Sequence, residues 1–169
     1  MNETILINRY LKKLTKHNPH ALHLDDDIFF DKSKRLAVSV DTYNEGIHFV
    51  DFKRPDLVIR KIIRSSISDI YSKGVEPKYF FLSGSGNKKK FNSRTMKLIS
   101  SSIAKEQKKF NIKLSGGDIT YSKLLTFTII TIGFADKIIY RNKCKLGDDI
   151  YVTGNIGDSY IGLQTLKKK

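Results

Sequence analysis

The sequence has 169 residues, of which 40% are hydrophobic and 28% charged, which is typical of one globular domain with a buried core. It has no apolar run near the roughly 20 residues that cross a membrane and no signal-peptide core, and its single cysteine, Cys144, excludes an intrachain disulfide and favours a reducing cytoplasm. The net charge of +14 favours anionic partners, but no zinc-finger, helix-turn-helix or RNA-binding motif accompanies it, so we expect neither a nucleic-acid nor a membrane partner.

The N-terminal residues 3–16 predict a helix that ends before Pro19, because the residue before a proline disfavours helical geometry. Its apolar residues fall on one side of the helix: Ile5, Leu6, Tyr10, Leu11 and Leu14. Three consecutive acids, Asp25 to Asp27, follow. Because like charges repel, such a run suggests a neutralising cation, and the alternative is a solvated loop.

The next stretch has the pattern of a strand that leads into a ligand-binding turn. Residues 36–40 are apolar and β-branched, which predicts a buried strand that stops at Asp41. A glycine-containing turn and His48 follow before apolar character returns at Phe49. A carboxylate at a strand end, with a histidine close by, is typical of ligand binding in α/β proteins. The alternative is that Asp41 caps a turn and His48 is a half-buried surface histidine.

A long helix is expected between Pro55, a favourable first-turn residue, and Gly74, a typical C-terminal stop. Half of its circumference is apolar: Val58, Ile59, Ile62, Ile63, Ile67 and Ile70. Asp69 falls inside this arc, where a charge needs a partner or a metal. Lys73 lies in the same arc, so Asp69 is either a cation ligand or the partner of Lys73 in an ion pair.

The second half of the chain alternates strands and helices. We expect strands at residues 78–83, 125–135 and 150–153, helices at 93–110 and from about 158, and a flexible surface loop at 84–88. Met96, Ile99, Ile103 and Phe110 form the buried stripe of the helix at 93–110. Residues 112–114 lead into Gly116-Gly117-Asp118, where paired glycines allow a phosphate to approach the backbone and the acid can hold its cation.

Four acids therefore recur in similar settings: Asp27, Asp41, Asp69 and Asp118. Hard cations such as Mg²⁺ prefer oxygen ligands and usually bridge to substrate phosphates. No cluster of histidine and cysteine suggests a softer metal, and no nucleophilic triad is evident. Several carboxylates, glycine-rich turns and surplus positive charge together favour phosphoryl transfer, in which the protein mainly positions and screens phosphates.

Five motifs, in order and spacing, resemble those of the thiamine-monophosphate kinase family, within the aminoimidazole-ribonucleotide-synthetase-like superfamily. They are Asp26-Asp27, the run from Ser39 to Phe49, Ser68-Asp69 with Gly74 and Pro77, Gly116-Gly117-Asp118, and the segment from Arg141 to Ser159. The resemblance extends from about residue 3 onward and matches the N-terminal domain of that family. The Asp41 to Phe49 element favours this family over selenophosphate synthetase and the hydrogenase-maturation enzyme.

The resemblance implies direct transfer of the ATP γ-phosphate to thiamine monophosphate, which gives thiamine diphosphate. It implies that Asp27, Asp41, Asp69 and Asp118 are catalytic through bound Mg²⁺, and that Ser39 and Val40 add metal ligands. It also implies that His48 contacts the thiamine phosphate and that Gly117, Asp118 and Arg141 face the nucleotide. The implied fold is an α/β (α+β) fold, a mixed sheet with helices on one face, which pairs with a second subunit to close a β-barrel in a homodimer.

The chain departs from the family pattern at three points. Asp25 replaces the glycine that usually precedes the first acid pair, and Tyr71-Ser72-Lys73 puts bulk and positive charge close to Asp69. We also expect residues 1–169 to form the N-terminal domain alone, without the family's C-terminal domain, which a separate chain can supply. The alternative to a kinase is therefore a non-catalytic half-protein that dimerises and binds nucleotide.

Overall fold

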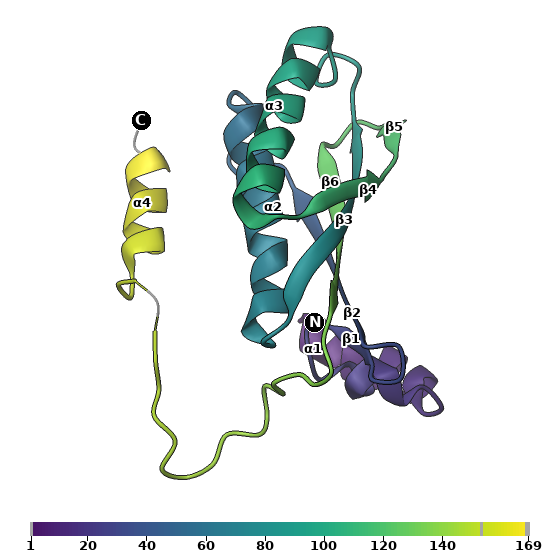
Figure 1. Ribbon diagram of the computed structural model, residues 1–169. Helices are drawn as coiled ribbons and strands as arrows, with labels where there is room; N and C mark the ends of the chain where they lie inside the picture. The colour runs from purple at the N-terminus through teal and green to yellow at the C-terminus, as the bar shows by residue number, and fades with distance from the viewer. Residues whose placement is uncertain (1, 153, 168–169) are drawn as a thin grey trace.

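The computed structural model describes residues 2–152 and 154–167 (Figure 1). The N-terminal region contains α1 (Glu3–Leu6), the π-helix η1 (Ile7–Leu11) and the 3₁₀-helices η2 (Lys12–Thr15) and η3 (Pro19–Leu24). The remaining elements are β1 (Phe29–Asp31), β2 (Leu36–Asn44), α2 (Pro55–Ser72), β3 (Glu76–Gly86), α3 (Ser93–Phe110), β4 (Lys113–Gly116), β5 (Ile119–Tyr121), β6 (Thr126–Phe134) and α4 (Asp158–Lys167). No helix in these described ranges is long and apolar enough to cross a membrane.

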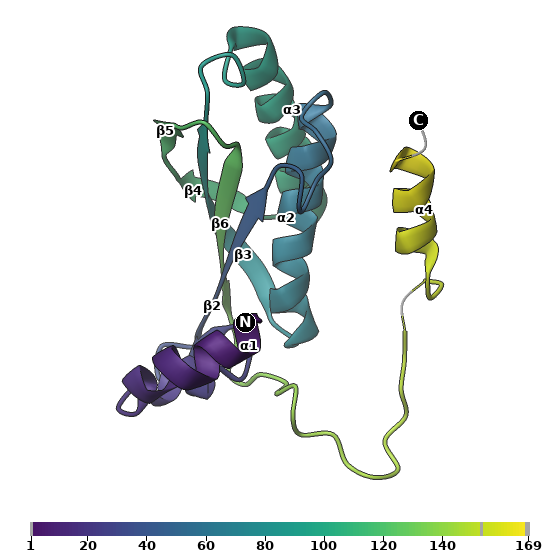
Figure 2. The same ribbon diagram turned by 180° about the vertical axis from the view of Figure 1, so that it is seen from behind.

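The six strands form one mixed sheet, as predicted. Its order is β1-β2-β6-β3-β4, and β5 pairs with β3 beyond β4. The pairs β1–β2, β2–β6 and β6–β3 are antiparallel, whereas β4 and β5 run parallel to β3. Figures 1 and 2 show α2 and α3 on the same side of this sheet, which confirms the predicted placement of the helices.

Helix α2 forms the centre of the core between the sheet and α3. It begins at Pro55, and it ends before Gly74, whose φ of +70° is a conformation that glycine adopts readily. The predicted apolar arc is buried in full, and Ile59, Ile62, Ile63 and Ile70 are completely inaccessible to solvent. The side-chain hydroxyls of Ser66 in α2 and Thr131 in β6, 2.9 Å apart, satisfy each other within the core.

Helix α3 starts and stops where the sequence predicts. The Asn92 side chain caps it by accepting a hydrogen bond from the Thr95 amide at 3.0 Å, and Asn111 ends it in the left-handed conformation. Arg64 of α2 donates two hydrogen bonds to the buried Glu106 of α3, at 2.7 and 2.9 Å. This pairing joins the two helices on the side away from the sheet.

Two strands are longer than predicted. β2 continues through Asp41 to Asn44, because every residue from Leu36 onward has a partner on β6. The expectation that the strand ends at Asp41 was therefore wrong. β3 includes residues 84–86, where a loop was expected; a Cβ on Gly84 would lie 3.1 Å from the Phe127 ring and 3.2 Å from the Phe91 ring. The glycines there allow close packing under aromatic rings.

The two ends of the chain also differ from expectation. The predicted first helix is divided into three short pieces of different pitch, and its apolar side is exposed, with Leu14 at 74%. Residues 150–152 form no strand, and Thr153 lies outside the described residues. The predicted C-terminal helix is confirmed as α4, which Figures 1 and 2 show beyond an extended segment and apart from the sheet.

The sheet face opposite α2 and α3 is called the open face here. Alternation along the strands and the pairing register place two apolar rows on it, Val38–Ile132–Tyr79 and Val40–Ile130–Phe81, followed by the hydroxyl row Thr42–Thr128–Ser83. Val40 is 60% exposed and Tyr79 42% exposed. An apolar sheet face of this kind is unusual unless something packs on it.

Candidate functional site

Three of the predicted acids line one cavity of about 580 Å³, called the acid cavity here. Asp27 comes from the loop after η3, Asp41 from β2, and Asp69 from the last turns of α2. Asp25, Asp26, Val40, Leu24 and Arg141 complete its inner wall, and Glu3, Thr4, Ile7 and Asn8 of the N-terminal helices form the outer one. Segments far apart in the sequence therefore bring carboxylates to the same place.

The strand β2 presents Asp41 to this cavity on the same face as α2. Ser39, Asp41 and Tyr43 alternate with Val40 and Thr42, so they point towards the helices. The buried Ser39 hydroxyl lies 3.5 Å from a carboxylate oxygen of Asp41, to which it donates. In the described chain β1 pairs with β2 at Leu36 to Val38, so the outer edge of β2 is free of a strand neighbour from Ser39 onward. Backbone oxygens are therefore available at the cavity as well.

Asp69 is the acid whose charge is least favourable. Burial, followed by the nearby charges of Asp41 and Asp27, raises the pKa of Asp69 to about 6. Lys73 opposes this shift, but it forms no ion pair with Asp69 among the described residues. The expected alternative of an Asp69–Lys73 ion pair was therefore wrong, because the lysine side chain turns towards the loop after η3.

Lys73 instead pairs with the acids of that loop. Its ammonium contacts the buried carboxylate of Asp26 and lies 3.9 Å from Asp27. Arg141, predicted to face the nucleotide, donates to the Asp27 carboxylate at 3.3 Å. Burial alone would raise the pKa of Asp26, but hydrogen bonds from Lys73 and from two backbone amides outweigh it and lower that pKa. Asp25 pairs with Lys12 at 2.6 Å, so the three acids form a partnered cluster instead of a solvated loop.

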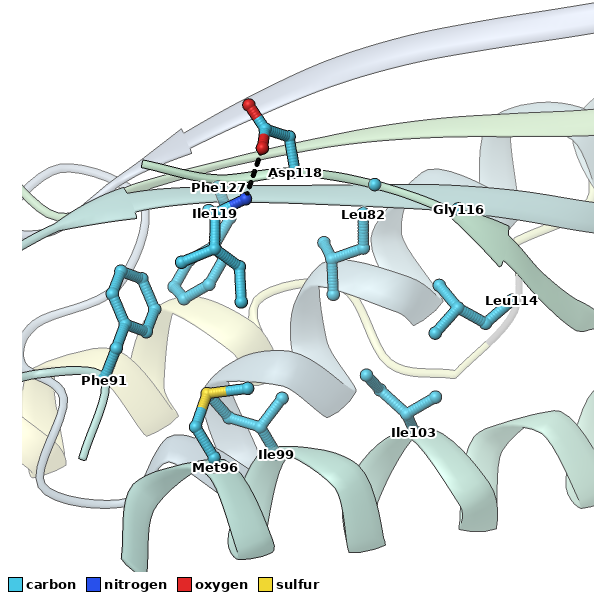
Figure 3. Close-up of a pocket in the computed structure, with 12 residues that line it drawn as sticks. Leu82, Phe91, Met96, Ile99, Ile103, Leu114, Gly116, Asp118, Ile119 and Phe127 are labelled. Atoms are coloured by element: carbon cyan, nitrogen blue, oxygen red, sulfur yellow. Dashed lines mark hydrogen bonds between the residues drawn. The ribbon is translucent and has the colours of Figure 1, made fainter. Parts of the chain in front are cut away.

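Asp118 and Gly117 lie at a different, mostly apolar cavity of about 350 Å³ between α3 and strands β3 to β5. Figure 3 shows Met96, Ile99 and Ile103 facing Leu82, Leu114 and Ile119 across it. The Asp118 carboxylate points away from these apolar side chains and accepts a hydrogen bond from the Ile119 amide at 2.8 Å. Within one chain the structure therefore brings three of the four predicted acids together and leaves Asp118 elsewhere.

Gly117 is fixed by the backbone of β3. A Cβ at this position would lie 1.9 Å from the carbonyl oxygen of Leu82, so only glycine fits without a backbone shift. The next residue continues this contact, because the Asp118 carbonyl accepts a hydrogen bond from the Gly84 amide at 2.8 Å. The double glycine therefore sets where the Asp118 carboxylate lies.

His48 lies outside both cavities, on the exposed turn after β2. Its Nδ1 accepts a hydrogen bond from the Asn44 amide at 3.0 Å, so the neutral ring carries its proton on Nε2. The Lys61 ammonium donates to the His48 carbonyl and fixes the turn to α2. The ring therefore presents an N–H donor away from its own backbone.

The donor chemistry of the acid cavity fits a hard cation shared with a ligand. Among the described residues no three histidine, cysteine or acidic side chains converge closely enough to hold a metal by themselves. Mg²⁺, however, needs only one or two carboxylates when phosphate and water oxygens complete its shell. Asp41 and Asp69, which have no ion-pair partner in the described chain, are the carboxylates available for this.

Sequence reasoning did not anticipate two features of these sites. Burial of Asp26 against Lys73 has no local signal, because the two residues meet only when η3 packs beside the end of α2. The apolar cavity was also missed, although its residues on α3 were predicted as a core stripe. A stripe that faces a core and one that faces a cavity have the same periodicity.

The fold and the acid cavity define an AIR synthase type of domain, and comparison with known families agrees. The model of the family "AIR synthase related protein, N-terminal domain" matches residues 24–135, so the chain belongs to this family.

Its similar proteins narrow the resemblance. Thiamine-monophosphate kinase from Buchnera aphidicola subsp. Acyrthosiphon pisum is 36% identical, over 96% of this chain and 51% of the relative. The crystal structure of thiamine monophosphate kinase from Aquifex aeolicus is 26% identical, with a TM-score of 0.77, over 94% of this chain and 55% of its own. A structure of AaThiL complexed with AMPPCP and TMP shares the fold, with a TM-score of 0.84 and 24% identity, over 99% of this chain and 55% of that one. This chain thus spans about half the length of the curated relatives it matches.

Proposed function

We propose that this chain is the N-terminal, ATP- and Mg²⁺-binding half of a thiamine-monophosphate kinase, which phosphorylates thiamine monophosphate to thiamine diphosphate. The observation that carries the proposal is the acid cavity, to which three separate segments bring Asp27, Asp41 and Asp69. The similarity to thiamine-monophosphate kinases and the AMPPCP and TMP complex of a structural neighbour support ATP and thiamine monophosphate as ligands. A reducing cytoplasm, which the single cysteine favours, is the proposed location.

In this proposal the protein positions phosphates and leaves charge screening to the cation. Mg²⁺, when bound, would neutralise charge on the phosphates during transfer. Asp27, Asp41 and Asp69 would hold it, with oxygens of Ser39 and Val40 at the free edge of β2. Arg141, which already contacts Asp27 at the cavity wall, would bind the nucleotide's phosphates.

The remaining predicted residues would act at the edges of this arrangement. The Nε2–H of His48 is free to donate to the phosphate of thiamine monophosphate, because Nδ1 is already engaged by the Asn44 amide. Gly117 leaves room for a close ligand approach, and Asp118 carries a carboxylate for a nucleotide-bound cation. These roles are predictions that the contacts above support.

The proposed assembly is a homodimer in which the open faces of two copies pack and their sheets close a barrel. Its support is the apolar pair of rows on that face, including Val40 and Ile130, which a second identical face would cover. Because the chain spans half the length of its relatives, the proposal also includes a C-terminal domain supplied by a further segment or a separate chain.

The second candidate function is a nucleotide-binding half-protein without turnover. The observation that favours it is the closed ion pairing of Asp26 and Asp27 with Lys73 and Arg141, which occupies part of the acid cavity. Binding and turnover therefore have to be measured separately.

The test uses thermal unfolding with Mg·ATP and product formation from thiamine monophosphate. We expect Mg·ATP to raise the melting temperature of the wild-type chain, and Asp41→Asn to abolish most of this gain. Asp136→Asn is the matched control, because Asp136 is 79% exposed and pairs with Arg35 at the surface. No gain in the wild type, or an equal gain in Asp41→Asn, would overturn the proposed site. Thiamine diphosphate as product identifies the kinase; Mg·ATP binding without product, even with a relative's C-terminal half added, identifies the half-protein.

A further inference from the structure

Lys73 is a buried lysine at the wall of the acid cavity. It is the C-terminal cap of α2, and its side chain is 4% exposed. Its backbone is fixed on both sides, because its amide donates to the Ile70 carbonyl at 3.2 Å and its carbonyl accepts from the Ile139 amide at 3.0 Å. The ammonium group is therefore held in one place.

The charges around this ammonium are unequally paired. The Asp26 side chain, 5% exposed, is its direct partner, and Asp27 lies 3.9 Å from it on the way to Arg141. A buried charge is tolerated only when it is paired, so Lys73 and Asp26 depend on each other. Asp41 and Asp69 form no ion pair among the described residues, which leaves the opposite wall of the cavity negative.

We propose that Lys73 is a built-in cation that neutralises the Asp26–Asp27 wall of the acid cavity, so that a divalent ion is held at the Asp41–Asp69 wall and binds more weakly than it would without the lysine. The inference rests on the proposed Mg²⁺ site. A fixed positive charge at one wall repels a second cation at the other, and it occupies the carboxylates that would otherwise help to bind a metal. Lys73 is thus a positioning residue for the metal.

The experiment measures Mn²⁺ binding to the intact chain by calorimetry and by the electron paramagnetic resonance of free Mn²⁺. We expect Lys73→Met to bind Mn²⁺ about tenfold more tightly or more than the wild type, because one repelling charge is gone and Asp26 and Asp27 are released. Lys78→Met is the matched control, since Lys78 is a more exposed lysine paired with Glu76 at 3.0 Å. Its Mn²⁺ affinity is expected to equal that of the wild type.

A second comparison avoids the cost of leaving Asp26 buried and unpaired. Asp26→Asn is compared with the double variant Asp26→Asn/Lys73→Met, in which both members of the buried pair are neutral. The double variant is expected to bind Mn²⁺ more tightly than Asp26→Asn. Equal affinity in both comparisons would show that Lys73 has only a structural role and would overturn the inference.

The inference and the proposed function can fail separately. If wild-type Mn²⁺ binding is lost in Asp41→Asn but Lys73→Met binds no more tightly than the wild type, the metal site stands and the role of Lys73 is wrong. If neither the wild type nor Lys73→Met binds Mn²⁺, or if binding is unaffected by Asp41→Asn, the proposed metal site fails and the inference fails with it.

Discussion

At the scale of single residues, the acid cavity combines two kinds of carboxylate. Asp26 is buried with its counter-ion, and its pKa is lowered by hydrogen bonds that outweigh burial. Asp69 is half-buried close to two other acids, and its pKa is raised to about 6. The first arrangement stabilises the fold, whereas the second stores unfavourable charge that a cation or a proton relieves.

The raised pKa of Asp69 predicts a pH dependence of stability in the metal-free protein. Between the unfolded pKa near 4 and the folded value of about 6, the folded state binds more protons, so the free energy of unfolding falls as pH rises. We expect Asp69→Asn to be more stable than the wild type by about 1–2 kcal/mol at pH 7.5, and the difference to vanish towards pH 4. Urea unfolding at a series of pH values measures this.

The matched control is Asp149→Asn at an exposed acid outside the cavity, for which no such pH-dependent difference is expected. A constant difference between Asp69→Asn and the wild type from pH 4 to 7.5 would contradict the assigned cause. Mg²⁺ is expected to reduce the difference at pH 7.5, because it stabilises the ionised Asp69 of the wild type.

At the scale of elements, the turn between β4 and β5 depends on one close backbone contact. Gly117 lies against the Leu82 carbonyl of β3, and the adjoining Asp118 carbonyl accepts from the Gly84 amide. The element that carries the predicted nucleotide-binding acid is therefore positioned by the central strand, not by its own short hydrogen-bond ladder.

This contact predicts that Gly117→Ala is destabilising. The added methyl group would overlap the Leu82 carbonyl, so the β4–β5 turn must move, at a cost of about 1–3 kcal/mol. Thermal and urea unfolding measure the loss. Gly162→Ala in α4 is the control: a Cβ there meets nothing within 4 Å, so the change should be neutral or slightly stabilising. Equal stability of Gly117→Ala and the wild type would refute the close contact.

At the scale of the whole molecule, the helices cover one face of the sheet and leave the open face apolar. Figures 1 and 2 show this asymmetry, and the register places Val40, Ile130 and Phe81 side by side in one row. The proposed homodimer accounts for this row, because two identical faces would cover each other.

The homodimer predicts that a charge in the middle of the open face causes dissociation. Ile130→Glu would bury two carboxylates in the paired interface, so we expect a monomer in sedimentation velocity at concentrations where the wild type is a dimer. Leu98→Glu, on the surface of α3 with 39% exposure, should leave the dimer intact. A wild type that is monomeric at all concentrations, or an Ile130→Glu variant that remains a dimer, would contradict the proposed assembly.

Much of the fold follows from local patterns in the sequence. The limits of α2 and α3 are set by Pro55, Gly74 and Asn92, whose effects on the backbone are local, and the buried arc of α2 follows from its periodicity. Strand ends were less predictable, because β2 continues past Asp41 through pairing with β6, which is distant in sequence. The first helix is broken for a similar reason: its apolar side has no packing partner among the described residues.

The sequence by itself determined which residue types could carry the chemistry: the recurring acids, the double glycine and the motifs that identify the family. Only the tertiary structure decided which of them meet. It brought Asp27, Asp41 and Asp69 to one cavity, left Asp118 at another, and buried Lys73 against Asp26 instead of Asp69. The physical reason is that propensity and periodicity act over a few residues, whereas burial and charge pairing depend on segments that folding brings together from across the chain.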